Sequence, residues 1–433
     1  MITMTSSPSA GLKGTFRVPG DKSISHRSIM LGSLAEGITE VSGFLEADDA
    51  LATLNAFEKM GVKIERLETG RLRIHGVGLH GLKAPKDTLY VGNSGTSMRL
   101  LSGILAGQQF DSVLTGDRSL TKRPMRRVLD PLALMGANVD SAALGTSPLK
   151  IKGNAQLAGI HYAMPMGSAQ VKSCLMLAGL YASGTTIIEE PAVTRDHTER
   201  MLRGFGYPVS TNKNVVSIKG GGKLTATSID VPGDISSAAF FMVAASITPN
   251  SNITLEHVGI NPTRTGVIDI LLKMGANIRL DNERLVGGEK VADIHVKSSQ
   301  LVGIDVPEAL VALAIDEFPV IFIAAAYANG TTRVTGAEEL RVKESDRIQT
   351  MVDGLQSLGV NIVGTPDGAV IKGGLVNSGA IESFDDHRIA MAFAVAGLNA
   401  EGAIIVNNCE NVSTSFPGFV ALATDCGFKL TAQ

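Results

Sequence analysis

A single sequence unit is repeated six times along this chain, and the repetition limits the folds that the chain can adopt. In each unit an amphipathic helical stretch ends in an apolar residue and a glycine, roughly every 70 residues. These glycines are Gly61, Gly136, Gly206, Gly275, Gly359 and Gly427. Glycine suits the residue just past a helix because that residue often takes a left-handed conformation. We therefore predict a helix end at each of the six positions, followed by a short strand.

Each unit also contains a second helical stretch that is apolar on nearly every face, such as SSAAFFMVAASI or FPVIFIAAAYANG. A helix that is apolar all round is buried. The repeat is too long for a solenoid, so six units divide more naturally into two globular domains of three. We predict an α/β fold with buried helices inside and sheets outside, and a cleft where the N-termini of the buried helices point. Converging helix N-termini attract anions through their free N–H groups and partial positive charge.

The composition excludes several classes of protein. A net charge of −3 over 433 residues gives no general basic field, which argues against a nucleic-acid binder. Cys174, Cys409 and Cys426 have no metal-ligand spacing, and Cys174 lies in an apolar stretch where we expect it to be packed. The sequence has no apolar run of about 18 residues and no secretory signal pattern. We expect a cytoplasmic protein that needs no metal.

Charged side chains collect where the buried helices are expected to begin. Lys22, Arg123, Lys343, Arg347 and Arg388 lie in or beside such segments, and lysine and arginine there suit a ligand with several negative charges. The spacing around Lys22 is not that of a nucleotide-binding P-loop.

Each of these signals also has a plainer interpretation. Gly95 fits an ordinary Gly/Ser turn, and Asp316 fits a helix N-cap. Arg123, with Arg126 and Arg127, fits a solvated helix face. Arg347 fits an ion pair with Glu344 or with a neighbouring acid on its own helix. The histidines His26, His197 and His387 lie beside arginines without metal-binding spacing, and we interpret them as structural or supporting residues.

Eight motifs carry most of these charged and glycine-rich positions: PGDKSISHRS, GNSGTSMR, GDRSLTKRPMRRVLDPL, MGSAQVKS, TRDHTERML, PGDISSA, RVKESDRI and DDHRIAMAF. Taken together, these motifs resemble the enolpyruvyl transferases, most closely those that act on shikimate 3-phosphate. The motifs extend from Pro19 to Phe393. The resemblance implies a two-domain, inside-out α/β barrel with three βαβαββ-like units per domain. Residues 20–230 would form one domain and residues 1–19 with 231–433 the other, with hinge crossovers near 19 and 231.

The resemblance also implies a reaction. The enolpyruvyl group of phosphoenolpyruvate would pass to the 5-hydroxyl of shikimate 3-phosphate by addition and elimination through a tetrahedral intermediate, without a cofactor. Asp316 would be the base, and Glu344 or Lys22 would exchange the proton at the methylene carbon. The residues implied for phosphoenolpyruvate are Lys22, Gly95, Arg123, Gln170, Arg347 and Arg388. Those implied for shikimate 3-phosphate are Lys22, Ser23, Arg27, Ser168, Gln170, Arg195, Asp316 and Lys343.

Two positions depart from the family pattern. Ser415 stands before Phe416-Pro417 where many relatives have lysine, and Leu100 follows Arg99 where many have proline. Gly95 leaves room for the herbicide glyphosate, and Leu100 leaves the degree of sensitivity open.

Three alternatives remain at this point. A UDP-N-acetylglucosamine enolpyruvyl transferase typically carries a cysteine in the loop that here is Asp117–Pro124, and this loop has none. An RNA 3′-phosphate cyclase would need nucleotide chemistry that nothing here supports. A non-catalytic anion-binding protein would not need Asp316 and Glu344 among the cations. We expect a monomer that binds small-molecule substrates and neither nucleic acid nor membrane.

Overall fold

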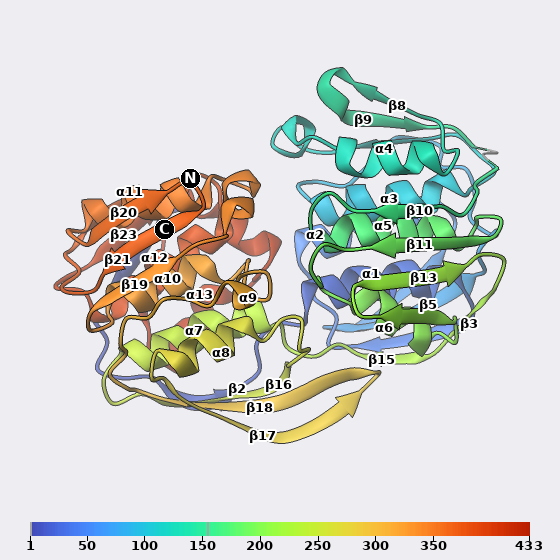
Figure 1. Ribbon diagram of the computed structural model, residues 1–433. Coiled ribbons are helices and arrows are strands. Elements are labelled where there is room, and N and C mark those ends of the chain that lie inside the picture. The colour runs from blue at the N-terminus through green and yellow to red at the C-terminus, as the bar shows by residue number, and fades with distance from the viewer. Residues whose placement is uncertain (1, 154–155) are drawn as a thin grey trace. The chain divides into compact units, whose positions relative to one another are not determined.

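The computed structural model describes residues 2–153 and 156–433. The chain divides into two compact units. Unit 1 comprises Met1–Pro19, Pro232–Leu285 and Lys290–Gln433, and unit 2 comprises Gly20–Val231 with the short segment Val286–Glu289. In Figure 1 unit 2 is coloured mainly blue to green, and most of unit 1 is yellow to red.

Six helices of the described chain are almost entirely buried, three in each unit. They are α1 (Lys22–Leu34), α3 (Gly95–Ala106) and α5 (Ala169–Gly179) in unit 2, and α7 (Ile235–Ile247), α10 (Phe318–Ala326) and α12 (His387–Ala396) in unit 1. Five of them begin at an Asp or Ser N-cap whose side chain accepts a backbone N–H; α10 follows Glu317, whose side chain makes no cap. These are the all-apolar stretches of the sequence, so their predicted burial is confirmed.

Each of the six sequence repeats contains a second helix, which has one polar face. These helices are α2 (Asp48–Lys59), α4 (Arg126–Leu134), α6 (His197–Gly204), α8 (Gly266–Lys273), α11 (Arg347–Ser357) and α13 (Phe419–Cys426). The glycine that ends each repeat has a positive φ, from 77° at Gly206 to 113° at Gly427. The six predicted helix ends are therefore confirmed. One short additional helix is α9 (Glu308–Val311).

Unit 2 contains three sheets. The first has the order β14-β3-β5-β4 with β15 also on β3; the second is β6-β7-β9-β8, and the third is β10-β11-β13-β12. Their bounds are β3 (Ala35–Ser42), β4 (Lys63–Glu68), β5 (Arg71–Val77), β6 (Leu89–Tyr90), β7 (Ser112–Thr115), β8 (Val139–Ala142), β9 (Thr146–Ile151), β10 (His161–Ala163), β11 (Thr185–Glu189), β12 (Val209–Asn212), β13 (Val215–Lys219), β14 (Leu224–Thr225) and β15 (Ser228–Asp230).

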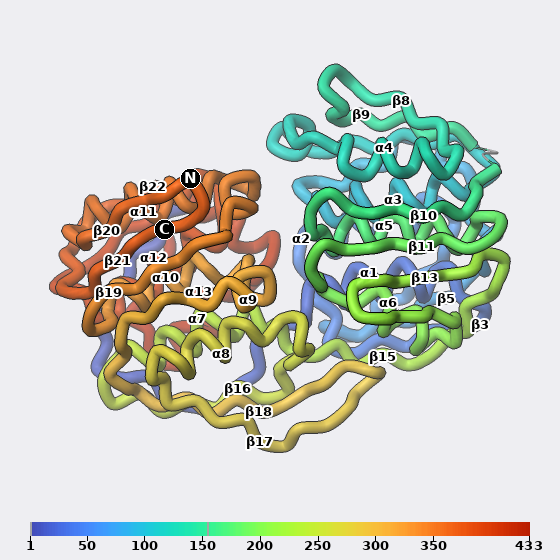
Figure 2. Tube along the Cα trace, in the orientation of Figure 1, coloured from blue at the N-terminus to red at the C-terminus, as the bar shows by residue number. Residues whose placement is uncertain are grey.

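Unit 1 also contains three sheets, with the orders β17-β18-β16-β2, β19-β21-β20 and β22-β23-β1-β24. Their bounds are β1 (Met4–Ser7), β2 (Lys13–Phe16), β16 (Asn252–Gly259), β17 (Asn277–Val286), β18 (Glu289–Lys297), β19 (Thr331–Val334), β20 (Asn361–Thr365), β21 (Gly368–Lys372), β22 (Gly379–Glu382), β23 (Ile404–Asn407) and β24 (Lys429–Ala432). The N-terminal strands complete two of these sheets, because β2 pairs with β16 and β1 lies between β23 and β24. Both chain ends consequently lie in unit 1 (Figure 2).

The sheets repeat one pairing pattern. In five of them a parallel pair is followed by antiparallel pairs, as in β6 with β7 and β7 with β9. In the sheet of β19 the parallel partner is reduced to isolated bridges at Val302 and Asp305. Each sheet is an open row of strands, and the fold is of the mixed α/β class.

Each unit has its own hydrophobic core, built around its three buried helices. The core of unit 1 includes a group of phenylalanines around Phe241, whose ring lies 5.1 Å from that of Phe16 and 5.6 Å from that of Phe428. Cys174 on α5 is fully buried in the core of unit 2, as predicted. No helix in the described part of the chain has the length and apolar character needed to cross a membrane.

Candidate functional site

The first turns of α3 and α5 meet in unit 2. Gln170, the second residue of α5, accepts a hydrogen bond from Nη1 of Arg99, and its amide donates to Oγ1 of Thr96 over 3.1 Å. Ser94 and Ser168 cap the two helices. The helix starts predicted to converge are therefore side by side here, with an arginine and a glutamine between them.

Gly95 stands directly against two arginines. A Cβ atom at this position would lie 3.1 Å from Nη1 of Arg99 and 3.5 Å from Nη1 of Arg123. Nη2 of Arg123 donates to Oδ1 of Asn93 over 2.7 Å, and Asn93 in turn donates to Asp117. Gly95 thus leaves the space in front of both guanidinium groups open, and its backbone N–H belongs to the first turn of α3.

Lys22, Ser23 and Arg27 share the first turns of α1. Lys22 forms an ion pair with Asp49 of α2. Nη1 of Arg27 donates to the carbonyl of Ser23 over 2.9 Å. Arg27 is buried, and this burial lowers the pKa of its guanidinium to about 10, although Glu199 opposes the shift. Arg27 therefore carries its positive charge at neutral pH.

Arg195 lies in the loop between β11 and α6. Hydrogen bonds hold the chain on both sides of this residue. Glu190 accepts hydrogen bonds from the backbone N–H and the hydroxyl of Thr194, and Oγ1 of Thr198 accepts from Nε of Arg27 over 2.7 Å. The segment that carries Arg195 is therefore joined to α1 by a hydrogen bond.

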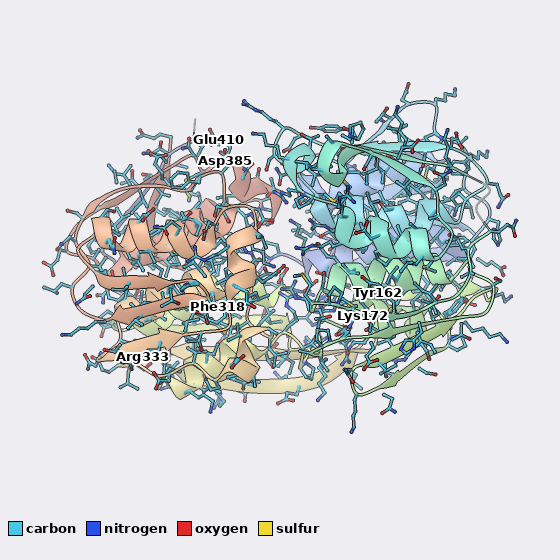
Figure 3. All side chains as sticks on the ribbon, turned by 45° about the horizontal axis from the view of Figure 1, so that its top comes forward. Tyr162, Lys172, Phe318, Arg333, Asp385 and Glu410 are labelled. Atoms are coloured by element: carbon cyan, nitrogen blue, oxygen red, sulfur yellow. The ribbon has the colours of Figure 1, made fainter. Side chains whose placement is uncertain are left out.

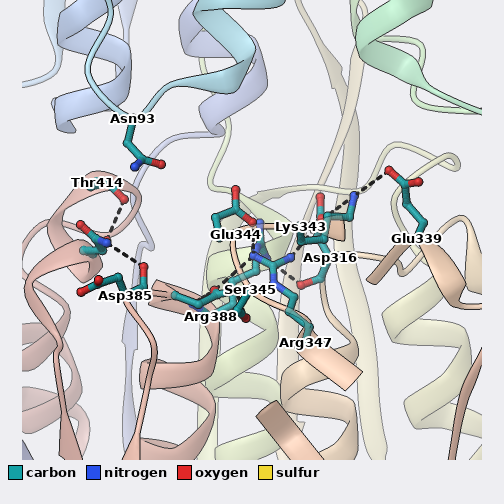
Figure 4. Close-up of polar contacts among 12 residues, drawn as sticks. Asn93, Asp316, Glu339, Lys343, Glu344, Ser345, Arg347, Asp385, Arg388 and Thr414 are labelled. Atoms are coloured by element: carbon teal, nitrogen blue, oxygen red, sulfur yellow. Dashed lines mark hydrogen bonds and ion pairs between the residues drawn. The ribbon is translucent and has the colours of Figure 1, made fainter. Parts of the chain in front are cut away.

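In unit 1, four of the predicted residues form one group around Arg347 and Asp316. Nη2 of Arg347 lies 2.7 Å from Oε2 of Glu344, and its Nη1 lies 3.5 Å from Oδ1 of Asp316. The same oxygen of Asp316 lies 3.7 Å from Nζ of Lys343. Arg347 is only 2% exposed, whereas Glu344 is partly exposed. Figure 4 shows these four side chains pointing toward one another.

Arg347 has a further partner that the sequence did not indicate. Nε lies 2.8 Å from Oδ2 of Asp386, the fully buried N-cap of α12. Burial disfavours the charge on Arg347, but Asp386 and Glu344 outweigh it and raise the pKa of the guanidinium. In return Arg347 lowers the pKa of Asp386 despite its burial.

Arg388 connects the starts of α12 and α10. Its Nη1 donates to the backbone carbonyl of Asp316 over 2.9 Å and lies 3.9 Å from Oε1 of Glu317. Glu317 also accepts a hydrogen bond from Ser236 of α7. The N-termini of α7, α10 and α12 therefore converge in unit 1.

The structure supports some of the plainer interpretations and contradicts others. Asp316 is not a helix N-cap, because Glu317 occupies that position. Arg347 does pair with Glu344, three residues earlier in the chain, but its buried partner is Asp386. Arg126 is a solvated helix residue with a side chain that is 67% exposed. Arg123 is half-buried and contacts Asn93, so it is not part of that face.

Sequence reasoning missed three residues that hold the predicted ones in place: Asp49 at Lys22, Arg99 at Gln170 and Asp386 at Arg347. Arg99 and Asp386 lie inside the motifs that carry the resemblance, so their place in these motifs could have marked them as residues near the site. Asp49 has no comparable signal. The described residues contain no group of three or more His, Cys, Asp or Glu side chains that could hold a metal ion.

Burial and neighbouring cations determine the state of one histidine. His26 is fully buried, and its Nδ1 lies 2.7 Å from Oγ1 of Thr53. Burial, with the charges of Lys22 and Arg27, lowers its pKa well below the usual value. His26 is therefore neutral at physiological pH and contributes no charge beside Lys22.

The structure therefore has a mixed α/β fold in which carboxylates and cations lie together near the starts of buried helices, a grouping that suits the binding of anionic ligands. A family model described as EPSP synthase (3-phosphoshikimate 1-carboxyvinyltransferase) matches residues 7–422. The 3-phosphoshikimate 1-carboxyvinyltransferase of Methylococcus capsulatus is 63% identical over 99% of this chain and 98% of its own length. That of Hydrogenovibrio crunogenus is 61% identical over 98% of this chain and 97% of its own length. A solved structure of EPSP synthase from Acinetobacter baumannii covers 100% of both chains, with 57% identity and a TM-score of 0.92.

The chain belongs to the EPSP synthase family. It is accordingly a transferase.

Proposed function

We propose that this protein transfers the enolpyruvyl group of phosphoenolpyruvate to the 5-hydroxyl of shikimate 3-phosphate and releases inorganic phosphate. The names of the relatives support this reaction. The contact of both Asp316 and Glu344 with Arg347 carries the proposal on the structural side. Two carboxylates beside one buried guanidinium provide a base and a proton carrier next to a group that binds anions.

The chemistry divides between the two carboxylates. Asp316 removes the proton of the 5-hydroxyl while the hydroxyl oxygen forms a bond to C2 of phosphoenolpyruvate. Glu344 protonates the methylene carbon, which gives the tetrahedral intermediate. Glu344 then takes a proton back from the resulting methyl group as the bond to phosphate breaks. Lys22 is the alternative carrier of this proton, because its ammonium belongs to the predicted phosphoenolpyruvate group.

The binding roles follow the two groups of cations. Arg123, Arg347 and Arg388, with Gly95 and Gln170, bind the phosphate and carboxylate of phosphoenolpyruvate. Shikimate 3-phosphate is held by Ser23, Arg27, Ser168, Gln170, Arg195, Asp316 and Lys343, with Lys22 shared by both substrates. Two features support a phosphate site at Gly95. The missing side chain leaves space in front of Arg99 and Arg123, and the N–H groups of the first turn of α3 can donate to an anion.

Phosphate release tests the proposal directly. Purified protein mixed with shikimate 3-phosphate and phosphoenolpyruvate is expected to release inorganic phosphate, at a rate unchanged by a metal chelator. A coupled phosphate assay and mass spectrometry of the product measure this. Release with UDP-N-acetylglucosamine instead of shikimate 3-phosphate would transfer the assignment to the sister reaction. Binding of both substrates without turnover would favour a non-catalytic anion-binding protein.

Replacement of Arg123 by alanine is expected to lower kcat/KM for phosphoenolpyruvate by about 100-fold or more. A charge-assisted contact to the substrate, worth roughly 3 kcal/mol, would be lost. Steady-state kinetics at saturating shikimate 3-phosphate measure the effect. Arg126→Ala is the matched control, since this nearby arginine is 67% exposed and should leave kcat/KM unchanged. Near-normal kinetics for Arg123→Ala would remove Arg123 from the site.

Several properties complete the proposal. The three helices buried in each unit support an inside-out α/β barrel arrangement of three repeats per domain, with domains of residues 20–230 and of 1–19 with 231–433. The crossovers near 19 and 231 would act as hinges. The protein would act as a cytoplasmic monomer without a cofactor. Glyphosate would compete with phosphoenolpyruvate at Gly95.

A further inference from the structure

Three charged side chains that the proposed chemistry does not use are buried together in unit 2. Lys172 of α5 is 1% exposed, Glu190 after β11 is 2% exposed, and Glu199 of α6 is 1% exposed. Nζ of Lys172 lies 2.6 Å from Oε1 of Glu190 and 2.7 Å from Oε1 of Glu199. We call these residues the Lys172 cluster; Figure 3 marks Lys172 in this unit.

The Lys172 cluster interacts with a residue of the predicted site. Burial raises the pKa of Glu199, although Lys172 opposes this shift, and Glu199 acts electrostatically on the guanidinium of Arg27. Buried ion pairs of this kind are poor evidence for stability, because apolar side chains of similar volume often stabilise a core as well or better. Four buried ionisable side chains at one place therefore suggest a role in fixing geometry.

The cluster fixes the loop that carries Arg195. Glu190 accepts hydrogen bonds from the backbone N–H of Thr194 over 2.8 Å and from its hydroxyl over 3.0 Å. Nζ of Lys172 lies 3.4 Å from the carbonyl oxygen of the same threonine. Each polar group of Thr194, the residue before Arg195, is thus held by a member of the cluster.

The residues adjacent to Lys172 on α5 and to Glu199 on α6 hold Arg27. Nη2 of Arg27 donates to Oγ of Ser173 over 2.8 Å, and its Nε donates to Oγ1 of Thr198 over 2.7 Å. Ser173 directly follows Lys172, and Thr198 directly precedes Glu199. The two hydroxyls also bond to each other over 2.7 Å. The ion pair between α5 and α6 therefore sets the spacing of the two groups that orient Arg27.

We propose that Lys172 is a positioning residue for shikimate 3-phosphate: through Glu190 and Glu199 it holds Arg195 and Arg27 in the geometry that binds this substrate. This inference rests on the proposed function, in which Arg195 and Arg27 bind shikimate 3-phosphate. Lys172 is too deeply buried to touch the substrate itself. Ser168, the N-cap of α5, and Gln170 in its first turn are partly exposed, so the proposed contacts of this segment with the ligand stay with them.

The double variant Lys172→Met/Glu190→Gln tests the proposal. It removes the cation of the cluster together with one of its carboxylates and leaves Arg27 and Glu199 in place. We expect KM for shikimate 3-phosphate to rise about tenfold or more, while kcat and KM for phosphoenolpyruvate stay within about threefold. Calorimetric titration of shikimate 3-phosphate into the protein without phosphoenolpyruvate should show the same loss of affinity.

A matched control removes another ion pair of unit 2 in the same way. Lys152 and Asp111 form a solvent-exposed pair at 2.9 Å, and Lys152→Met/Asp111→Asn should leave KM for both substrates unchanged. If the core variant does not fold, Thr194→Val takes its place. It deletes only the hydroxyl that donates to Glu190 and should raise KM for shikimate 3-phosphate alone.

The outcomes separate the two levels of inference. If the wild-type protein releases no phosphate, the proposed function fails before any variant is compared. If the wild type is active and a folded variant keeps its affinity for shikimate 3-phosphate, only the positioning role is overturned. The positioning role would also be overturned if kcat fell and both KM values rose by similar factors, since general damage to the fold would not single out shikimate 3-phosphate.

Discussion

Replacement of Asp316 by asparagine is expected to lower kcat by about 100- to 10,000-fold, the usual contribution of a general base. The amide has nearly the same shape but cannot take the proton of the 5-hydroxyl. It can still accept the weak contact from Nη1 of Arg347, at 3.5 Å, so the cluster around Arg347 should persist. KM for both substrates should therefore change by only a few-fold. Steady-state kinetics with a phosphate-release assay measure both parameters.

The control for this variant is Asp305→Asn. Asp305 is also an aspartate of unit 1 with an arginine partner, Arg333 at 3.4 Å, but its side chain is 78% exposed. Its replacement should leave kcat unchanged. If kcat of Asp316→Asn remains within about tenfold of the wild type, another group removes the hydroxyl proton and the assignment of Asp316 is wrong.

The second large effect is expected for Arg347→Met, on stability as well as on activity. Its loss leaves the fully buried carboxylate of Asp386 without its cation, and breaking a buried ion pair in this way costs about 3–5 kcal/mol. The free energy of unfolding, measured by urea titration at pH 7, should fall by that amount. Activity should fall by about 100-fold or more, because Asp316 and Glu344 lose their shared partner and phosphoenolpyruvate loses a guanidinium.

The stability loss should depend on pH. In the wild type Arg347 holds the pKa of Asp386 below its usual value, so the ion pair stabilises the fold above the unfolded pKa of about 3.9 and is lost as the pH falls through the folded pKa. In Arg347→Met the buried Asp386 no longer has this cation and is protonated more readily. The difference in unfolding free energy should therefore narrow as the pH is lowered from 7 toward 4.

A surface arginine provides the comparison. Arg333→Met removes an exposed ion pair with Asp305 and should change the unfolding free energy by less than about 1 kcal/mol at any pH. A similar small and pH-independent change for Arg347→Met would show that Asp386 finds other compensation in the core.

Much of the site could be anticipated because helix starts are local features. Ser94 and Ser168 act as N-caps through contacts with residues three positions later. The family resemblance indicated Asp316, Glu344, Lys343 and Arg347 as site residues, and the structure places these four together. Their roles in binding and catalysis stay predictions until the variants are measured.

Long-range partners could not be anticipated in the same way. Asp386 lies 39 residues from Arg347, and Arg99 lies 71 residues from Gln170. Nothing in the sequence around Lys172 indicates that it meets carboxylates from two other segments. Such contacts depend on which helix faces pack together, and helical periodicity identifies a buried face without naming its neighbour.

Periodicity and helix capping act within a few residues, so the six repeats, the buried helices and the glycines that end the amphipathic helices could be predicted from local patterns. All six of these glycines take the left-handed conformation that this reasoning required. Which charges are neutralised, and by which partner, became visible only in the folded chain. A buried charge must find its counterion in space, and its nearest opposite charge is set by packing rather than by distance along the chain.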